Sequence, residues 1–447
     1  MFDLTQGSVG RTLTKMTVFT TLGMVSILGF ALADAYYVGL LGKEYLASIS
    51  YCVPVLLFTS GIGVGLGMGS EAILARFVGE SASHDAREFA TIAMGFGTFV
   101  SLLFVALGYL CLDAIPVWLE AAPELYPLMN QYLSIWFIGI VPLVLSLLGG
   151  SLARALGDAQ TPAVVMVVTS ILNAVLDPIL IFGLGNWVPA YGFEGAAWAT
   201  LISRGVAGLW TIYLFVVKYD LLARSVPSWE RVLGDSKEIC RLGAPATVTQ
   251  LIFPLGQAVL LKLLSVFPVA AVAAFGMALQ VEAFGFIVLM SLSIILGPFV
   301  GQNMGAQKPG RVHRALRLST QFNLVHGVGL AGIFWFFGES VLGLFHDDPD
   351  VVSYMVLVMK WLSLSWVLEG LRLLAAPVFT NLGSSIPPMV LVTLRFFGVA
   401  IPLGWVLRGT WGFDGVLFAF ALGNVVAGVV SYVWLKQRLP RKEIELA

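Results

Sequence analysis

The chain has 447 residues, of which 58% are hydrophobic and only 11% are charged, whereas soluble domains usually carry about a quarter charged residues. This composition excludes an ordinary soluble protein and favours a polytopic membrane protein. The formal net charge is −1, from 25 basic and 26 acidic residues, and there is no long basic block, so a nucleic-acid partner is excluded as well.

Apolar runs separated by polar breaks predict an all-α polytopic membrane protein with twelve transmembrane helices. A run such as 164–184 is apolar on every side, which suits a helix surrounded by lipid. In chain order, the predicted spans are roughly 12–40, 45–76, 88–113, 125–150, 162–185, 192–217, 241–266, 270–299, 313–338, 351–376, 386–407 and 412–435.

The connections between these spans alternate in charge. The odd-numbered loops hold only Lys43 and Arg408, whereas basic residues gather in the N-terminal segment, in the even-numbered loops and in the carboxyl-terminal tail, which includes Arg441 and Lys442. By the positive-inside rule, we expect a protein of the cytoplasmic (inner) membrane with both termini in the cytoplasm.

Three short patterns occur twice, in the same order and at nearly the same spacing, which indicates a duplication. The pairs are 77–79 with 299–301, 157–162 with 383–388, and 192–195 with 412–415. Six spans per repeat is an even number, so the sequence predicts two six-helix lobes related by a pseudo-twofold axis along the membrane normal. We expect an amino-terminal lobe at 1–218, a cytoplasmic linker at 219–240 and a carboxyl-terminal lobe at 241–447.

Four acidic residues lie deep in apolar runs: Asp34, Asp177, Glu282 and Glu369. A charge near the bilayer centre costs roughly 2.5–3.5 kcal/mol on insertion scales, so each acid needs a compensating role. Asp34 has no basic residue within two turns of its own helix, and burial makes the charge of such a group responsive to its surroundings. Asp34 is therefore the strongest candidate for a functional group, and the alternative is a structural hydrogen bond to a neighbouring helix.

The fifth span combines a polar pair with a proline. Asn173 and Asp177 are spaced i and i+4, so they share one face of the helix and can hold a proton or another cation together. Pro178 cannot donate to the carbonyl of Ala174, so we expect a kink that frees this acceptor. The alternative is a packing kink with two incidental polar groups.

The second half carries different charges. Glu369 and Arg372 are spaced i and i+3, which suits a structural ion pair and a substrate contact equally. Glu282 has no basic residue within reach on its own helix, so its role stays open. Gly61, Gly65 and Gly69 form a small-residue stripe that lets helices approach closely. No metal, nucleotide or nucleophile pattern occurs, so we expect neither an enzyme nor a cofactor.

Together these features resemble the multidrug and toxic compound extrusion (MATE) family, with its two lobes of six helices. Asp34, the Asn173, Asp177 and Pro178 run, and the turn from Gly301 to Ala306 carry the resemblance. The resemblance implies a MATE fold and cation-coupled antiport of amphipathic, often cationic drugs. Within the family, Asp34, Asn173 and Asp177 resemble the DinF-like branch, in which the amino-terminal lobe carries the coupling acids.

The sequence departs from the NorM-like branch of this family, which places an acid in span 7 and another in span 10 for sodium. Span 7 has no acid here, and the expected place lies near Phe253. Glu369 matches the span 10 position. We therefore expect the coupling cation in the amino-terminal lobe.

Three functions stay open at this stage: a drug antiporter driven by protons (or by sodium), a flippase for lipid-linked sugars, and a membrane-embedded enzyme. The antiporter is favoured because spans 1, 2, 7 and 8, apart from Lys15, Arg76 and Arg241 at their ends, offer only Lys262 for a pyrophosphate. The expected partners are amphipathic drugs, H⁺ or Na⁺, and the lipid bilayer. Tyr37 joins Glu282, Glu369 and Arg372 as a candidate substrate or ion-pair residue, and we expect a monomer.

Overall fold

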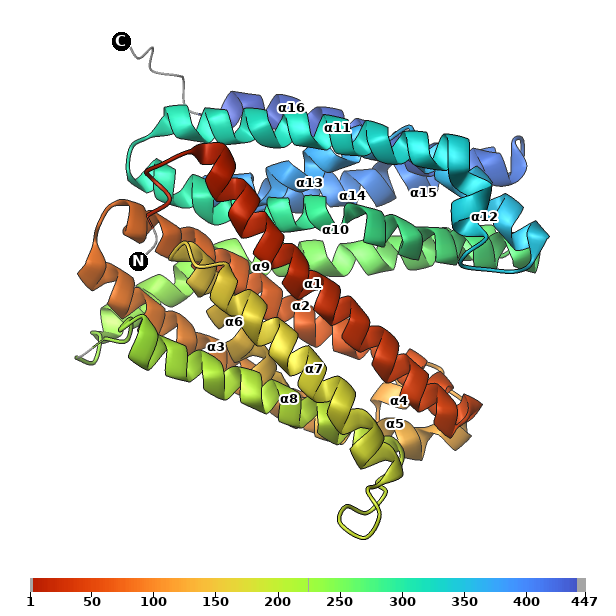
Figure 1. Ribbon diagram of the computed structural model, residues 1–447, viewed down its shortest axis with the longest axis horizontal. Coiled ribbons are helices and arrows are strands. Elements are labelled where there is room, and N and C mark those ends of the chain that lie inside the picture. Colours follow the sequence, from red (N-terminus) through yellow and green to blue (C-terminus); the bar gives the residue numbers. More distant parts are fainter. Residues whose placement is uncertain (1–2, 224, 440–447) are drawn as a thin grey trace. The chain divides into compact units, whose positions relative to one another are not determined.

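The computed structural model describes residues 3–223 and 225–439, and within these ranges its regular elements are helices joined by short connections (Figure 1). In this part of the chain, ten helices are long and apolar enough to cross a membrane, or up to twelve if each of two bent helix pairs counts as one span. The all-helical membrane class expected from composition is confirmed. Arg441 and Lys442, which support the expected orientation of the tail, lie outside the described residues.

Two units are distinguished by their internal packing. The first is formed mainly by Val18–Thr247, and the second by Leu4–Thr17 together with the residues from Val248 onward. Two long helices therefore contribute to both units, α1 (Val9–Leu41) and α9 (Trp229–Leu264). The division between the two units falls inside α9. The expected linker at 219–240 is only partly a connection, because its first half precedes α9 and its second half belongs to this helix.

The first unit contains a helix pair that is bent by 47° where one span was predicted at 125–150. Gly139 lies at the break between these two helices, α5 and α6. The helices of this unit, besides parts of α1 and α9, are α2 (Lys43–Gly79), α3 (Ser83–Cys111), α4 (Ile115–Trp118), η1 (Pro123–Leu125), α5 (Tyr126–Ile138), α6 (Ile140–Ala155), α7 (Gln160–Phe182), α8 (Phe193–Tyr213) and the π-helix η2 (Leu214–Lys218).

The glycine stripe of α2 allows α2 and α9 to approach closely, as predicted. A Cβ atom added to Gly65 would lie 2.0 Å from Oγ1 of Thr247, and one added to Gly69 would lie 2.9 Å from the backbone nitrogen of Gly243. Both distances are too short for a real Cβ atom, so only glycine permits this backbone contact.

The second unit also contains a broken span. Its predicted tenth span at 351–376 is a helix pair bent by 61° around Leu364 and Ser365. The helices of this unit, besides parts of α1 and α9, are α10 (Val269–Gly305), α11 (Pro309–Leu342), α12 (Pro349–Ser363), α13 (Trp366–Asn381), α14 (Ile386–Thr393), the π-helix η3 (Leu394–Ala400), α15 (Ile401–Leu407) and α16 (Gly412–Arg438).

The segment before α1 is held by the end of α10 and the first turn of α11, within the second unit. The backbone nitrogen of Leu4 donates to Oε1 of Gln302 (2.9 Å), and Nδ2 of Asn303 donates to the Leu4 carbonyl (3.2 Å). Arg311 donates to the carbonyls of Gln6 (2.9 Å) and Gly7 (2.8 Å). We call these contacts the N-terminal clamp. They satisfy backbone groups that lie ahead of the first helical turn.

Candidate functional site

The polar pair of α7 faces α8 within the first unit. Asn173 and Asp177 are 2% and 0% exposed, and Thr200 of α8 is 4% exposed. In the amide orientation that pairs donors with acceptors, Nδ2 of Asn173 donates to Oδ2 of Asp177 (3.0 Å), and its Oδ1 accepts from the backbone nitrogen of Thr200 (3.1 Å). α7 and α8 pack side by side in Figure 1. The amide therefore connects the Asp177 carboxylate to the next helix.

Asp34 of α1 belongs to the same neighbourhood, because it interacts electrostatically with Asp177. Oδ1 of Asp34 and Oδ1 of Asp177 are both buried and have no hydrogen-bond partner among the described residues. Tyr37, one turn after Asp34, packs edge-on against Phe182 at a ring distance of 6.5 Å. The first unit thus brings Asp34, Asn173 and Asp177 together around two unsatisfied carboxyl oxygens.

Pro178 lies inside α7, which continues beyond it to Phe182. The kink that the proline predicts, and the carbonyl it would free at Ala174, remain predictions.

Four further residues surround this site, Arg204, Trp136, Tyr132 and Thr200, and the sequence pattern did not single them out. The guanidinium carbon of Arg204 lies 3.7 Å from the ring centre of Trp136, which is a close cation–π contact. Tyr132 stacks on Trp136 with a ring distance of 6.2 Å, and it interacts electrostatically with Asp34 and Arg204. Thr200 supplies the backbone contact to Asn173. The i, i+4 spacing of Thr200 and Arg204 was the available signal.

The second unit holds a charge cluster of a different kind. Glu369 accepts two hydrogen bonds from Arg372, at 2.9 and 2.6 Å, and a third from Nη1 of Arg395 at 2.8 Å. These three side chains are between 3% and 10% exposed. The i, i+3 pair predicted from the sequence therefore forms, and Arg395 of η3 completes it. Whether Glu369 and Arg372 also contact substrate remains a prediction.

Glu282 of α10 lies close to this cluster. Its Oε1 accepts a hydrogen bond from Nε1 of Trp366, and it interacts electrostatically with Arg395 and Glu369. Phe253, near the place where a NorM-like acid was expected, packs edge-on against Phe396 at 5.8 Å. Its ring centre lies 5.6 Å from the Arg395 guanidinium carbon. The span 7 position where a NorM-like acid was expected is therefore occupied by an aromatic ring that contacts Arg395.

A buried carboxylate also organises the connection from α6 to α7, outside the spans. Asp158 accepts from Lys218 (2.7 Å), from the Tyr219 hydroxyl (3.0 Å) and from both the backbone and the hydroxyl of Thr161. Burial alone would raise the pKa of Asp158, but the hydrogen bonds from Lys218 and Thr161 and the Lys218 charge hold it below its ordinary value. This network ties α7 to the end of the α8–η2 segment.

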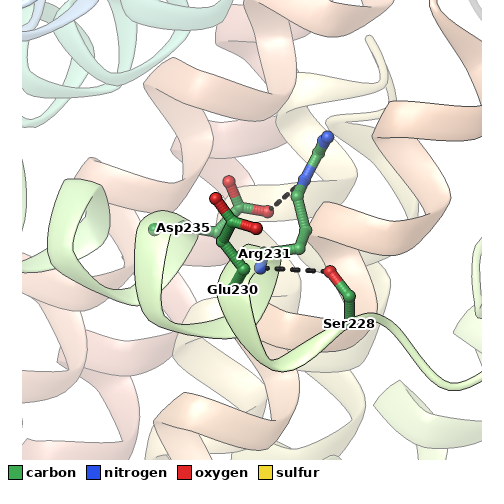
Figure 2. A pocket seen from close by; sticks show the side chains of 5 residues that line it. Ser228, Glu230, Arg231 and Asp235 are labelled. Atoms are coloured by element: carbon green, nitrogen blue, oxygen red, sulfur yellow. Dashed lines mark hydrogen bonds and ion pairs between the residues drawn. The ribbon is translucent and has the colours of Figure 1, made fainter.

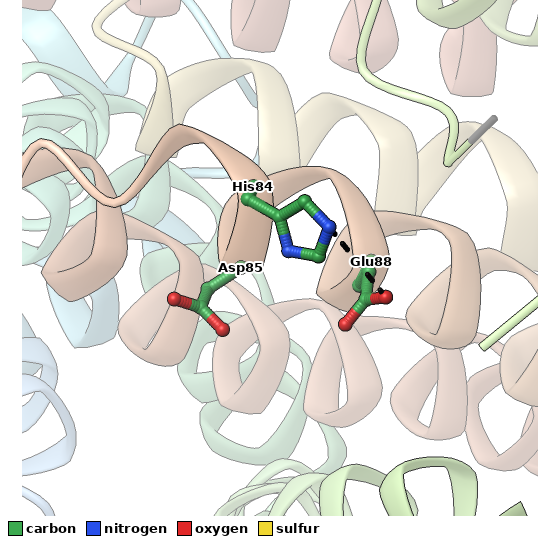
Figure 3. A group of neighbouring side chains, drawn as sticks. All are labelled: His84, Asp85 and Glu88. Carbon is green, nitrogen blue, oxygen red and sulfur yellow. Dashed lines mark ion pairs between the residues drawn. The ribbon is translucent and has the colours of Figure 1, made fainter. Parts of the chain in front are cut away.

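Two surface features lie near the start of α9. A hollow of about 430 Å³ is lined by Ser228, Glu230, Arg231, Gly234 and Asp235 (Figure 2). Its one arginine is engaged with Asp235 at 3.0 Å and with Asp85 at 2.9 Å. Potential metal ligands, His84, Asp85 and Glu88, follow one another on α3 (Figure 3), with ligand atoms within 4.8 Å of one another. Because Asp85 already pairs with Arg231, we assign no metal to this group.

Known proteins match this chain over nearly its whole length. The model of the MatE family matches residues 20–179 and 245–406. A Shewanella oneidensis protein named "FAD transporter" is 33% identical over 98% of this chain and 96% of its own length. The Staphylococcus aureus "Multidrug export protein MepA" is 24% identical over 96% of this chain and 94% of its own.

The fold agrees with these sequence matches. The crystal structure of the Vibrio cholerae MATE transporter VcmN in the bent form superimposes with a TM-score of 0.89 at 25% identity, and the match covers 96% of this chain and 97% of VcmN. The expected MATE fold is confirmed. The chain belongs to the MatE family, and it is a membrane transporter rather than an enzyme.

Proposed function

We propose that the protein is a cation-coupled antiporter that exports amphipathic small molecules across the cytoplasmic membrane, with both termini in the cytoplasm. The observation that carries this proposal is the pair of carboxyl groups, Asp34 and Asp177, each with a buried oxygen that lacks a hydrogen-bond partner among the described residues. An ionised carboxylate in such surroundings is costly unless it gains a cation. Binding and release of that cation can therefore drive a conformational change in the first unit.

The driving ion in this proposal is the proton. A proton needs only one carboxyl group whose charge responds to its surroundings, and Asp34 beside Asp177 and Asn173 meets that need. Sodium is the second candidate, because two carboxyls, the Asn173 amide and a carbonyl freed by Pro178 would supply several oxygen ligands. Placement of Asp34, Asn173 and Asp177 in one site also favours the DinF-like branch.

The second unit supports a coupling site in the first. Glu369 already receives three charge-assisted hydrogen bonds from Arg372 and Arg395, so its charge is balanced without any added cation. The acids Glu282 and Glu369 are matched in number by these two arginines. Within the second unit, the same pairing argues against a flippase, since Arg372 and Arg395 are engaged with Glu369 rather than held ready for a pyrophosphate.

The proposed cycle uses α1 as the moving element. Protonation of Asp34 removes its charge and weakens its interaction with Asp177 and Arg204, so α1 can bend and a cationic substrate is displaced outward. Loss of the proton on the cytoplasmic side restores the carboxylate. The proton and the cationic substrate therefore compete for the same carboxylate charge. This mutual exclusion is what antiport requires.

Cargo is the least constrained part of the proposal. Cationic drugs suit a site built from carboxylates, and several relatives carry multidrug names at 22–24% identity. A second candidate is flavin adenine dinucleotide, because the relative named for FAD transport is 33% identical over 98% of the chain. The two cargos differ in sign of charge, so protonation would displace a cationic drug directly but would not repel an anionic dinucleotide.

The decisive experiment expresses the protein in cells that lack their own drug pumps and follows two cargos. Ethidium accumulation reports drug export, and flavin released to the medium reports dinucleotide export. The proposal expects at least one of them to depend on the protein and to be lost in Asp34→Asn. Unchanged ethidium and unchanged flavin, with the protein shown to be in the membrane, would contradict the proposed function.

Everted vesicles in sodium-free buffer then test the driving ion. Adding a transported cation should release part of an imposed proton gradient. Dye movement that requires sodium and ignores the proton gradient would assign the coupling to sodium and leave the antiporter proposal in place.

A further inference from the structure

Arg204 lies on the same face of α8 as Thr200, four residues earlier, and this face meets Asn173 of α7. Its guanidinium group is stacked on Trp136, with 3.7 Å between the guanidinium carbon and the ring centre. Nη1 also lies 3.7 Å from the place that a Cβ atom on Gly139 would occupy. Arg204 therefore sits at the carboxyl-terminal end of α5, where the helix dipole favours a positive charge.

The charge of Arg204 is held in place but is not paired. Nη1 is buried and has no hydrogen-bond partner within the described ranges, and the same is true of one oxygen each on Asp34 and Asp177. Arg204 interacts electrostatically with Asp34 and with Tyr132. Tyr132 in turn interacts electrostatically with Cys52 of α2 and with Asp177.

Arginines in the second unit show the contrast. Arg372 and Arg395 each donate to a carboxylate oxygen within 2.9 Å, so they act as structural ion-pair partners. Arg204 makes no such ion pair in the described part of the chain, although two carboxyl groups with unsatisfied oxygens share its surroundings. A guanidinium group does not lose its proton in proteins, so this charge is constant throughout the transport cycle.

The charges of Asp34, Asp177 and Arg204 determine how many cations the site needs to become neutral. When both carboxyls of the site are ionised, two negative charges and the Arg204 charge sum to −1, so one monovalent cation makes the site neutral. We propose that Arg204 is the fixed counter-charge of the candidate coupling site, and that it limits each cycle to one coupling cation instead of two. This inference rests on the proposed coupling role of Asp34 and Asp177, and it makes Arg204 a positioning residue that acts through them.

The first test does not depend on transport. Purified protein in lipid nanodiscs is titrated with acid while infrared spectroscopy follows the carboxylic acid band that is lost in Asp34→Asn. Arg204→Gln removes the charge and keeps hydrogen-bonding capacity, whereas Arg204→Lys keeps the charge. An opposite charge nearby typically changes the midpoint of such a titration by about 1–3 pH units. We expect the band of Arg204→Gln to appear at a pH at least about one unit higher than in the wild type.

Two controls separate charge from structure. Arg204→Lys should titrate close to the wild type, and Lys262→Gln, which removes an exposed positive charge from α9, should leave the titration unchanged. Equal midpoints for wild type and Arg204→Gln would overturn the proposal. Equal shifts in Arg204→Gln and Arg204→Lys would also overturn it, because the effect would then come from packing against Trp136.

The second test uses the unmodified protein, so it does not require the variants to fold. In proteoliposomes, one proton should enter for each molecule of a monovalent cationic dye that leaves, and dye movement should be insensitive to an imposed membrane potential. Two protons per dye would overturn the counter-charge assignment while leaving the antiporter intact. Dye export without any cation dependence would contradict the proposed function instead, so the two failures are distinguishable.

Discussion

Nη1 of Arg395 donates a hydrogen bond to Oε1 of Glu369 over 2.8 Å, although the two residues are 26 positions apart in the chain. The bond joins η3 to α13 and places a second arginine on a carboxylate that Arg372 already binds. A buried ion pair of this kind contributes little net stability when complete, but breaking it leaves an uncompensated charge. The cluster therefore makes the second unit sensitive to the loss of one acid.

Glu369→Gln should destabilise the protein strongly. It leaves Arg372 and Arg395 facing a neutral amide inside the second unit, and removal of one partner from a buried pair costs about 3–5 kcal/mol. Thermal unfolding in detergent measures the effect, and Glu339→Gln, on the exposed side of α11, is the matched control. A melting temperature equal to that of the control would show that this cluster is dispensable for stability.

Asp34→Asn should abolish transport while expression and folding stay intact. The amide imitates the protonated acid, so the site can no longer alternate between charged and neutral forms. Dye or flavin export from cells measures the loss, with Asp347→Asn in the loop before α12 as a control of the same chemistry at an exposed position. Normal export by a well-expressed Asp34→Asn protein would reduce Asp34 to a structural role.

Asp177→Asn should severely impair transport. Asn173→Ala should also lower transport below the wild-type level, but by less than Asp177→Asn does. The alanine removes the hydrogen bond to Asp177 and leaves the backbone nitrogen of Thr200 without its acceptor. A hydrogen bond to a charged group contributes about 1.5–3 kcal/mol, and its loss disfavours the ionised Asp177 carboxylate, so the apparent affinity of the site for the coupling proton should rise about tenfold or more and the proton should be released less readily. The pH dependence of export measures this affinity. The reverse order of severity would contradict the arrangement proposed for α7.

Gly65→Ala should destabilise the first unit, because the added methyl group would lie 2.0 Å from Oγ1 of Thr247 and 2.8 Å from the Gly243 carbonyl. Overpacking of this kind costs about 1–3 kcal/mol. Gly95→Ala in α3 is the control, since nothing lies within 4 Å of its added Cβ atom and alanine favours a helix. Thermal unfolding of the two variants should therefore change in opposite directions, and equal melting temperatures would contradict the close approach of α2 and α9.

Asp158→Asn should lower stability at neutral pH by about 1 kcal/mol, as for other side chains that hold the start of a helix. The pKa of Asp158 is below its ordinary value in the folded protein, so its contribution is present above the unfolded pKa and is lost as the pH falls through the folded pKa. Melting curves of the wild type and variant should converge in acid. A difference that persists in strong acid would show that the carboxylate charge is not the cause.

Spans were predictable from the sequence because a helix in lipid must be apolar on nearly all sides. The interruptions of these spans could not be predicted from the sequence. The break at Gly139 and the bend around Ser365 lie inside apolar runs and depend on how neighbouring helices pack. The beginning of α9 was also missed. Its polar first turns are anchored by the pair between Arg231 and Asp85, and the sequence pattern of 229–240 indicated a linker.

The candidate site was predictable in part. Asp34, Asn173 and Asp177 were found because charge and amide groups are costly inside apolar runs. Arg204 and Arg395 also lie within predicted spans, but the sequence pattern does not show their partners, because these come from other helices. Only the fold shows that Arg204 stacks on Trp136 and that Arg395 reaches Glu369.

The N-terminal clamp has a consequence for the order in which the protein is made. Leu4 and Gln302 are 298 positions apart, and Gln6 and Arg311 are 305 apart. The ribosome must therefore complete α10 and reach α11 before the segment ahead of α1 can form these hydrogen bonds. The segment ahead of α1 is synthesised early but is held in place only after most of the helices have been made. Its attachment to α10 and α11 is therefore a late step of biogenesis.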